Sequence, residues 1–218
     1  LHSKIVITAT AVLLVGGTAA FYFLERDGAF AGVPEGQKVL MAAFQSVTPR
    51  TAGFNTVDLM ALSESATLLT MMLMFVGAGS GSTGGGIKVN TFAVLVLETL
   101  SQIRRKEDVN VFRRRLDEET IHRAHASVTM YTMACLVGCL VLCLQGIALE
   151  DALYEAISAI GTVGLTRGVT PVLPELSKAV ILLLMFAGRV GSMSVAMAVT
   201  RDHPAPRVRN VPEKILIG

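Results

Sequence analysis

The chain has 218 residues, of which 52% are hydrophobic and 17% are charged, and its formal net charge is +2. Its mean hydropathy of +0.58 is far above that of an ordinary soluble domain, so the composition predicts a membrane protein. The net charge alone is uninformative, and no nucleic-acid partner is expected. The first residue is Leu and no signal-peptide pattern follows it, so we expect the C-terminal portion of a longer protein.

The first half predicts a membrane span, a short helix and an interrupted span. Apolar residues run from about 4 to 24, long enough to cross a hydrocarbon core of roughly 30 Å. Residues 39–47 are apolar but too few to cross, and they lead into the loop "TPRTAGFNTVD". As one straight helix, the next apolar stretch, residues 63–101, would be about 57 Å long, which exceeds the bilayer. We therefore expect it to break at the glycine-rich segment "FVGAGSGSTGGGIKV", residues 75–89.

The second half predicts the same order of elements. A span at about 124–147 is followed by a short apolar piece at 151–160, the loop "GTVGLTRG" and a last span at about 175–200. Basic residues are concentrated in residues 101–123 and in the C-terminal tail after residue 200. Because two spans separate these basic segments, they lie on one side of the membrane, and their Arg and Lys content predicts that this side is cytoplasmic.

The two halves align at a single offset of 111 residues. This offset pairs Thr51 with Thr162, Gly53 with Gly164, and "LMFVG" with "LMFAG". Because a loop and a helix share one offset, we interpret the halves as an internal repeat, with units at 1–111 and 112–218. The predicted fold class is an all-α membrane protein built from tandem span–pore helix–filter loop–span repeats of the potassium-channel type.

The loop of each unit has the pattern of a potassium-selective filter. In "TVGYG" filters, backbone carbonyls replace the hydration shell of the ion; here "TVGL" and, more loosely, "TAGF" follow a helix too short to cross. Such a loop requires glycine because some residue must tolerate φ > 0, and the short helices can direct their negative C-terminal ends at the ion. A single "TVGL" is more typical of an ordinary turn, but two such loops in the same setting favour a filter.

Five motifs together resemble the Ktr/Trk/HKT superfamily of potassium transporters, and most of all its KtrB-type membrane subunits. They are "SVTPRTAGFNTVD", "GSGSTGGGIKV", "GTVGL", "GRVGSMSV" and the terminal "PEKILIG". In that superfamily four span–pore–span repeats surround one pore, so the resemblance implies that this chain holds the third and fourth repeats. It implies a bacterial plasma-membrane protein that transports K+, with Na+ as an alternative or coupling ion and no organic cofactor in this chain.

The resemblance assigns roles to two sets of residues. Backbone carbonyls that coordinate K+ are implied at Thr51, Ala52, Gly53, Phe54, Thr162, Val163, Gly164 and Leu165. An intramembrane gate below the filter is implied at Gly77, Gly79, Ser80, Gly81, Ser82, Thr83, Gly84, Gly85, Gly86, Lys88 and Arg189. Many relatives carry Ser-Pro or Cys-Ala where this chain has Gly79-Ser80, which leaves the path of the loop open. A loop that lines a water-filled cavity explains why a membrane chain interrupts its own helix here.

The resemblance also implies an assembly. It predicts homodimers in membrane lipid, each protomer with its own pore, docked on a cytoplasmic ring of nucleotide-binding KtrA-type subunits. The basic segment 101–123 either docks that partner or only sets the topology and keeps the surface solvated. The terminal "ILIG" is expected near the dimer interface.

Arg189 is the charge that lies deepest in a predicted span. It follows Glu175 by 14 residues, or roughly 21 Å along a helix. A guanidinium facing lipid at that depth is costly, so we expect it to face a wet cavity, where it repels cations, or to pair with a carboxylate. Gly188 and Gly191 flank it, and we expect them to allow close approach of the glycine-rich loop.

Other classes of function are weighed against transport. A membrane anchor or sensor predicts no filter-like loops. A membrane enzyme needs paired carboxylates, a Ser–Lys pair or an HExxH motif, and the predicted spans contain none. "GSGSTGGGIK" is similar to a phosphate-binding loop, but Ile87 separates Gly86 from Lys88 and no strand precedes it. A sodium-selective or non-selective transporter of the same superfamily is the alternative to a potassium transporter.

Overall fold

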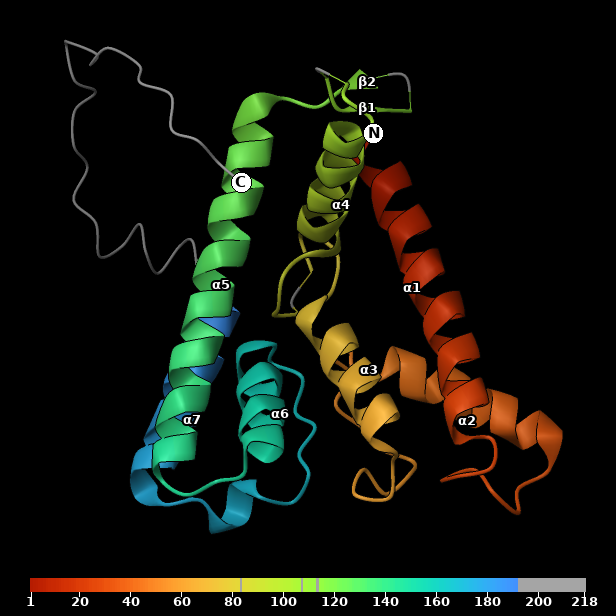
Figure 1. Cartoon of the computed structure of the whole chain (residues 1–218), viewed down its shortest axis with the longest axis vertical. Coiled ribbons are helices and arrows are strands. Elements are labelled where there is room, and N and C mark those ends of the chain that lie inside the picture. Colours follow the sequence, from red (N-terminus) through yellow and green to blue (C-terminus); the bar gives the residue numbers. More distant parts are fainter. Residues whose placement is uncertain (83, 107, 113, 192–218) are drawn as a thin grey trace.

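The computed structural model describes residues 1–82, 84–106, 108–112 and 114–191, and this part of the chain is almost entirely helical (Figure 1). Its elements are α1 (His2–Glu25), α2 (Glu35–Val47), α3 (Glu64–Phe75), α4 (Val89–Ile103), β1 (Asn110–Val111), β2 (Arg114–Arg115), α5 (Glu118–Leu144), α6 (Leu149–Ile160), the 3-10 turn η1 (Thr170–Val172) and α7 (Glu175–Val190). The predicted helical fold class is confirmed, and the small antiparallel hairpin of β1 and β2 is an addition to it.

Two units repeat the same order of elements. The long helix α1 is followed by the short α2 and then by the α3–α4 pair, and the long helix α5 is followed by the short α6 and then by α7. Helix α3 begins at Glu64 and α7 begins at Glu175, which keeps the offset of the sequence repeat. The boundary placed at residue 111 falls inside the β1–β2 hairpin, in which Val111 pairs with Arg114.

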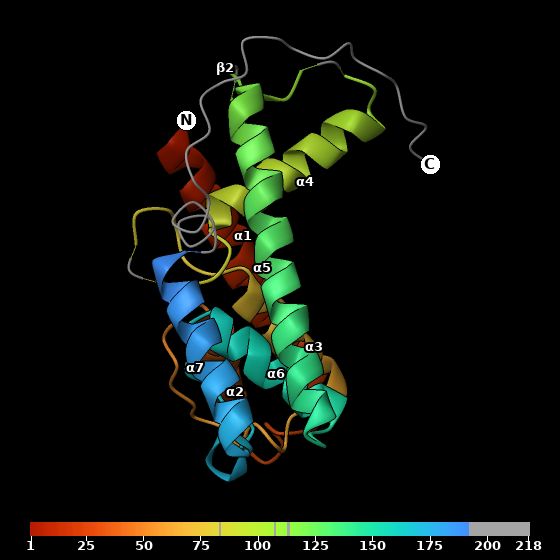
Figure 2. The same ribbon diagram turned by 90° about the vertical axis from the view of Figure 1, so that its left-hand side faces the viewer.

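The predicted break in the second span is present. Helix α3 has 12 residues and α4 has 15. At 1.5 Å per residue they are about 18 and 22 Å long, so neither crosses a core of roughly 30 Å alone. Figure 2 shows α4 steeply inclined to α5, against which it packs. Within the described part of the chain, α1 and α5 are long and apolar enough to cross a membrane.

The last span differs from its prediction. Helix α7 ends at Val190, and Gly191 follows it with φ +93°. A right-handed helix does not continue through a left-handed residue, and glycine adopts that conformation freely. The single helix predicted to reach residue 200 is therefore interrupted at Gly191, and residues 192–200 lie outside the described part. Helix α5 begins at Glu118, earlier than predicted, so the end of the basic segment is helical.

A large apolar core joins both units. It is formed by α1, α2, α3, α5, α6 and α7, and its fully buried members include Phe21, Met74, Leu142 and Ile160. A second, smaller cluster packs the hairpin onto the nearby ends of α1, α4 and α5. In Figure 1 the hairpin and the start of α1 lie at one end of the molecule, and α2 and α6 lie toward the other. The two short helices therefore lie far from the basic end of the molecule.

The buried carboxylate of Glu25 fastens the end of α1 to the start of α3. Glu25 is 1% exposed and accepts hydrogen bonds from Ser63 N at 2.9 Å, Ser63 Oγ at 2.5 Å and Ala29 N at 2.9 Å. Ser63 is also the N-cap of α3. Because burying an unpaired charge is expensive, these three donors are what make the position tolerable.

Candidate functional site

The loops after α2 and α6 lie against each other. A Cβ atom added to Gly53 would stand 2.2 Å from the carbonyl oxygen of Val163, and one added to Gly164 would stand 3.8 Å from the Cα atom of Gly53. Residues 51–54 and 162–165 are 111 residues apart in sequence but meet in space. The eight candidate filter residues therefore form one site between the two units.

Both loops have the same backbone conformation. Thr51 has φ +72° and Gly53 has φ +75°, while Thr162 has φ +51° and Gly164 has φ +91°. The prediction that the glycines adopt positive φ is confirmed. The left-handed threonines were not predicted, because a β-branched residue at φ > 0 is a rare and strained conformation. The two loops therefore share left-handed residues at their first and third positions.

Hydroxyl groups of the short helices hold the fourth residue of each loop. Thr48 is the residue directly after α2. Its Oγ1 atom accepts a 3.0 Å hydrogen bond from Phe54 N and donates to the Phe54 carbonyl oxygen. Ser158 Oγ, in the last turn of α6, donates a 2.5 Å hydrogen bond to the Leu165 carbonyl oxygen. These carbonyls are thus directed back toward their own helices. Sequence reasoning missed both hydroxyls: Thr48 lies three residues before "TAGF", and Ser158 lies four residues before "TVGL", inside the preceding helix.

The glycine-rich loop between α3 and α4 is closed at its base. Val76 and Ile87 form a parallel bridge, Gly77 N donates to the Ile87 carbonyl at 2.9 Å, and Val89 N donates to the Ala78 carbonyl at 3.2 Å. The described candidate gate residues on this loop are Gly77, Gly79, Ser80, Gly81, Ser82, Gly84, Gly85 and Gly86, and the candidate Thr83 lies outside the described residues. The loop is therefore a compact structure with a fixed base.

The end of this loop contacts both candidate filter loops. Gly85 N donates a 2.9 Å hydrogen bond to Thr162 Oγ1. A Cβ atom added to Gly85 would stand 2.3 Å from the same hydroxyl oxygen, and one added to Gly84 would stand 2.6 Å from Thr51 Oγ1. Only glycine allows the backbone to approach this closely. The loop therefore lies directly against the first residue of each filter loop.

Two basic side chains flank the glycine-rich loop. Lys88 Nζ donates a hydrogen bond to the Gly84 carbonyl oxygen and lies within electrostatic range of Arg189. Arg189 is in the last turn of α7, with an exposed side chain. The prediction that the glycine-rich loop approaches Gly188 is wrong. The nearest atom to a Cβ added at Gly188 is the Ile160 carbonyl oxygen, at 1.9 Å. Gly188 instead lets α7 pack tightly on the end of α6.

An ion pair and a hydrogen bond organise the beginning of α2. The Tyr22 hydroxyl donates a 2.7 Å hydrogen bond to Glu35, and Lys38 Nζ lies 3.3 Å from the same carboxylate. The Tyr22 hydrogen bond, together with that of Lys38, holds the pKa of the Glu35 carboxyl below its usual range. The start of α2 therefore carries an ionised carboxylate at neutral pH.

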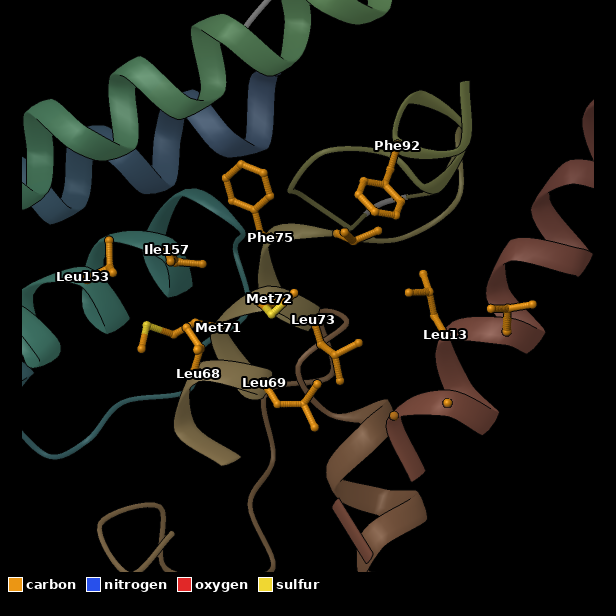
Figure 3. A pocket seen from close by; sticks show the side chains of 14 residues that line it. Leu13, Leu68, Leu69, Met71, Met72, Leu73, Phe75, Phe92, Leu153 and Ile157 are labelled. Atoms are coloured by element: carbon orange, nitrogen blue, oxygen red, sulfur yellow. The ribbon is translucent and has the colours of Figure 1, made fainter. Parts of the chain in front are cut away.

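A separate cavity of about 450 Å³ lies between α1, α3 and α6 (Figure 3). It is lined by apolar side chains and glycines, among them Leu13, Met72, Phe75 and Ile157, which Figure 3 labels. None of the lining side chains carries a charge or a hydroxyl group. The cavity therefore has no side-chain ligands for a cation and is not part of the candidate site.

The comparisons with known proteins agree with this architecture. A family model described as "TrkH: Cation transport protein" matches residues 2–210. The Ktr system potassium uptake protein B of Vibrio alginolyticus is 38% identical over 207 residues, which are 94% of this chain and 46% of that protein. The potassium/sodium uptake protein NtpJ of Enterococcus hirae is 35% identical over 228 residues, with 100% of this chain and 50% of that protein covered.

A solved structure has the same fold. The crystal structure of the potassium transporter TrkH from Vibrio parahaemolyticus matches with a TM-score of 0.77 at 20% sequence identity, covering 88% of this chain and 43% of that chain. The chain spans about half the length of the curated relatives that it matches.

Proposed function

The chain belongs to the TrkH family of cation transport proteins, and from this premise we propose that it forms part of a potassium-translocating pore in a bacterial plasma membrane. Proteins similar to it are named as potassium or potassium/sodium uptake proteins. In this proposal residues 1–111 and 112–218 are the third and fourth of four pore repeats. The observation that carries it is the shared backbone conformation of two adjoining loops, with positive φ at Thr51, Gly53, Thr162 and Gly164.

Potassium is coordinated by backbone carbonyls of residues 51–54 and 162–165. Converging carbonyl dipoles replace the water that the ion loses, so no carboxylate is needed. The carbonyls of Phe54 and Leu165 already accept hydroxyl hydrogen bonds. Since a carbonyl oxygen has two lone pairs, these two residues can still face the ion, but we assign the stronger coordination to the other six.

The glycine-rich loop and Arg189 form the gate. The hydrogen bond from Gly85 to Thr162, and the contact of Gly84 with Thr51, support a loop that closes the inner end of the filter. Ions pass when the loop moves away. Lys88 and Arg189 add positive charge beside the loop, and like charges repel a cation more strongly in a narrow pore than in water.

The assembly follows from the resemblance to Ktr systems. We place a homodimer in the lipid bilayer, with a KtrA-type nucleotide-binding ring on the cytoplasmic side, in contact with residues 101–123 and the C-terminal tail. The arrangement in Figure 1 supports this side, because the basic hairpin lies at the end opposite the short helices. No organic cofactor is assigned to this chain.

A second candidate is a transporter that also carries sodium, either as a coupled ion or as an alternative substrate. It is supported by the relative whose name includes both ions. The looser filter motif "TAGF" in the third repeat favours this candidate over strict potassium selectivity.

Growth at low potassium tests the proposed function. The full-length protein is expressed in bacteria that lack their own potassium uptake systems, with an empty vector as the control and membrane abundance measured in parallel. We expect the protein to restore growth. If the protein is abundant in the membrane and growth equals that of the empty vector, potassium uptake is not its function.

A further inference from the structure

Glu155 is a buried carboxylate in the middle of α6, directly behind the fourth filter loop. It is 4% exposed. One oxygen, Oε1, accepts hydrogen bonds from the Thr166 hydroxyl and from Arg167 N, the latter at 3.2 Å. The other oxygen, Oε2, accepts a 2.6 Å hydrogen bond from Thr170 Oγ1. All three donors belong to the segment that follows the filter loop.

These bonds continue a series that begins inside the filter loop. The Ser158 carbonyl accepts from Val163 N at 2.9 Å, and Ser158 Oγ donates to the Leu165 carbonyl. One turn earlier on α6, Glu155 binds Thr166, the next residue along the chain. A cavity of about 390 Å³ is lined by both Glu155 and the filter residue Gly164. Glu155 therefore acts on the segment that determines how the fourth loop leaves the pore.

The charge of Glu155 is compensated by hydrogen bonds rather than by the neighbouring arginine. Arg167 contributes its backbone N–H to Glu155, while its guanidinium pairs with Glu150 and with Asp151, the latter at 3.2 Å. A buried carboxylate held only by neutral donors is costly to keep. The free-energy cost of burying Glu155 is consistent with a role in holding residues 166–170 in place.

The third repeat has no equivalent of this carboxylate. The offset of 111 residues pairs Glu155 with Phe44, whose side chain has no polar atom. The third loop relies on Thr48, which binds Phe54 through both of its backbone groups. The two filter loops are therefore fixed by different side chains: the fourth by a carboxylate of its own short helix, and the third by the hydroxyl of Thr48.

We propose that Glu155 is a positioning residue that holds the fourth filter loop from behind and thereby determines how strongly the pore prefers potassium to sodium. This inference rests on the proposed transport function. Loss of the carboxylate frees Thr166, Arg167 and Thr170, so the segment relaxes and the carbonyls of the loop can adapt to a smaller ion.

The experiment compares Glu155→Gln and Thr170→Val in the full-length protein. Rubidium uptake into cells is measured while potassium or sodium competes, and the ratio of the two inhibition constants reports the preference. We expect the preference for potassium to fall about two- to tenfold in both variants, because the loss of one hydrogen bond changes an equilibrium by about that factor. Thr170→Ser keeps the donor and is expected to retain the wild-type ratio.

Glu25→Gln is the matched control. Glu25 is equally buried and also accepts three hydrogen bonds, but its partners join α1 to α3 and not to a filter loop. We expect this variant to reduce the amount of protein in the membrane without changing the ion preference. A general loss of stability would affect both carboxylate variants alike, whereas a positioning role affects only Glu155→Gln.

The outcomes separate the inference from the proposed function. If Glu155→Gln and Thr170→Val take up rubidium with the wild-type ratio, the inference is overturned and the transport function stands. If Glu155→Gln does not reach the membrane, Thr170→Val decides, because it keeps the carboxylate and removes one donor. If the wild-type protein itself takes up no rubidium, the proposed function fails and the inference fails with it.

Discussion

The backbone N–H of Gly85 donates a 2.9 Å hydrogen bond to the hydroxyl oxygen of Thr162. This bond joins the glycine-rich loop of one unit to the first residue of the candidate filter loop of the other. A loop that lies against the hydroxyl at the inner end of a filter stands in the way of an ion that approaches it. In the proposed pore, the bond thus describes a closed gate that rests on the filter itself.

The first prediction concerns the close approach of Gly85. In Gly85→Ala the new methyl group would stand 2.3 Å from Thr162 Oγ1 and 2.7 Å from the Gly161 carbonyl oxygen, so the loop has to move away from the filter. We expect higher rubidium flux at equal membrane abundance. Gly79→Ala is the control in the same loop, because its methyl group would meet only Val6 Cγ1, at 3.3 Å. Equal flux in both variants would exclude the contact as a gate.

The second prediction concerns the length of the loop. Deleting residues 80–83 leaves the base pairing of Val76 with Ile87 intact but shortens the segment that reaches the filter. We expect increased ion flux and weaker control by the cytoplasmic partner, measured as rubidium uptake with and without that partner. A deletion that inserts normally but conducts less than wild type would indicate that the loop supports the fold instead.

The third prediction ranks the two filter glycines. Gly53 has φ +75° and its Cβ would stand 2.2 Å from the Val163 carbonyl oxygen, whereas Gly164 has φ +91° and meets only a Cα atom at 3.8 Å. An L-residue in the left-handed region costs about 1–2 kcal/mol. We expect Gly164→Ala to lower the potassium-over-sodium preference about fivefold or more, and Gly53→Ala to lower it further. The opposite ranking, measured by competition for rubidium uptake, would contradict the arrangement of the loops.

The fourth prediction concerns Arg189. Like charges about 4 Å apart cost around 1 kcal/mol in water and more in a narrow pore. We therefore expect Arg189→Ala and Arg189→Gln to raise the maximal rubidium flux at least about fivefold with little change in apparent affinity, while Arg189→Lys keeps most of the block. Lys178→Ala, near the opposite end of the same helix α7, where Lys178 pairs with Glu175, is the control. Unchanged or lower maximal flux in a well-inserted Arg189→Ala protein would favour an ion pair over a barrier.

The order of the elements and the convergence of the loops follow from the repeat in the sequence. The offset that pairs Gly53 with Gly164 also pairs the first residues of α3 and α7, Glu64 and Glu175, and the positive φ of both glycines was predicted correctly. Such features are local or periodic, so they can be predicted from the residues themselves.

Features that depend on how the chain folds back on itself could not be predicted. The hydroxyl of Ser158 and the carboxylate of Glu155 act on residues that the fold of the loop brings back to α6. Gly188 was assigned to the wrong neighbour, because no pattern in the sequence indicates that α7 packs on the Ile160 carbonyl. The end of α7 was placed too late, because the apolar stretch continues beyond Gly191 although the helix does not.

Competition during rubidium uptake into liposomes tests the central claim most directly. Purified full-length protein is reconstituted without any partner, and uptake is measured against graded potassium and sodium, with the Gly53→Ala Gly164→Ala double variant alongside. The account predicts uptake that potassium inhibits at lower concentrations than sodium, and a double variant in which this difference is reduced or lost. Uptake with the same ion preference in both proteins would show that these loops are not the filter.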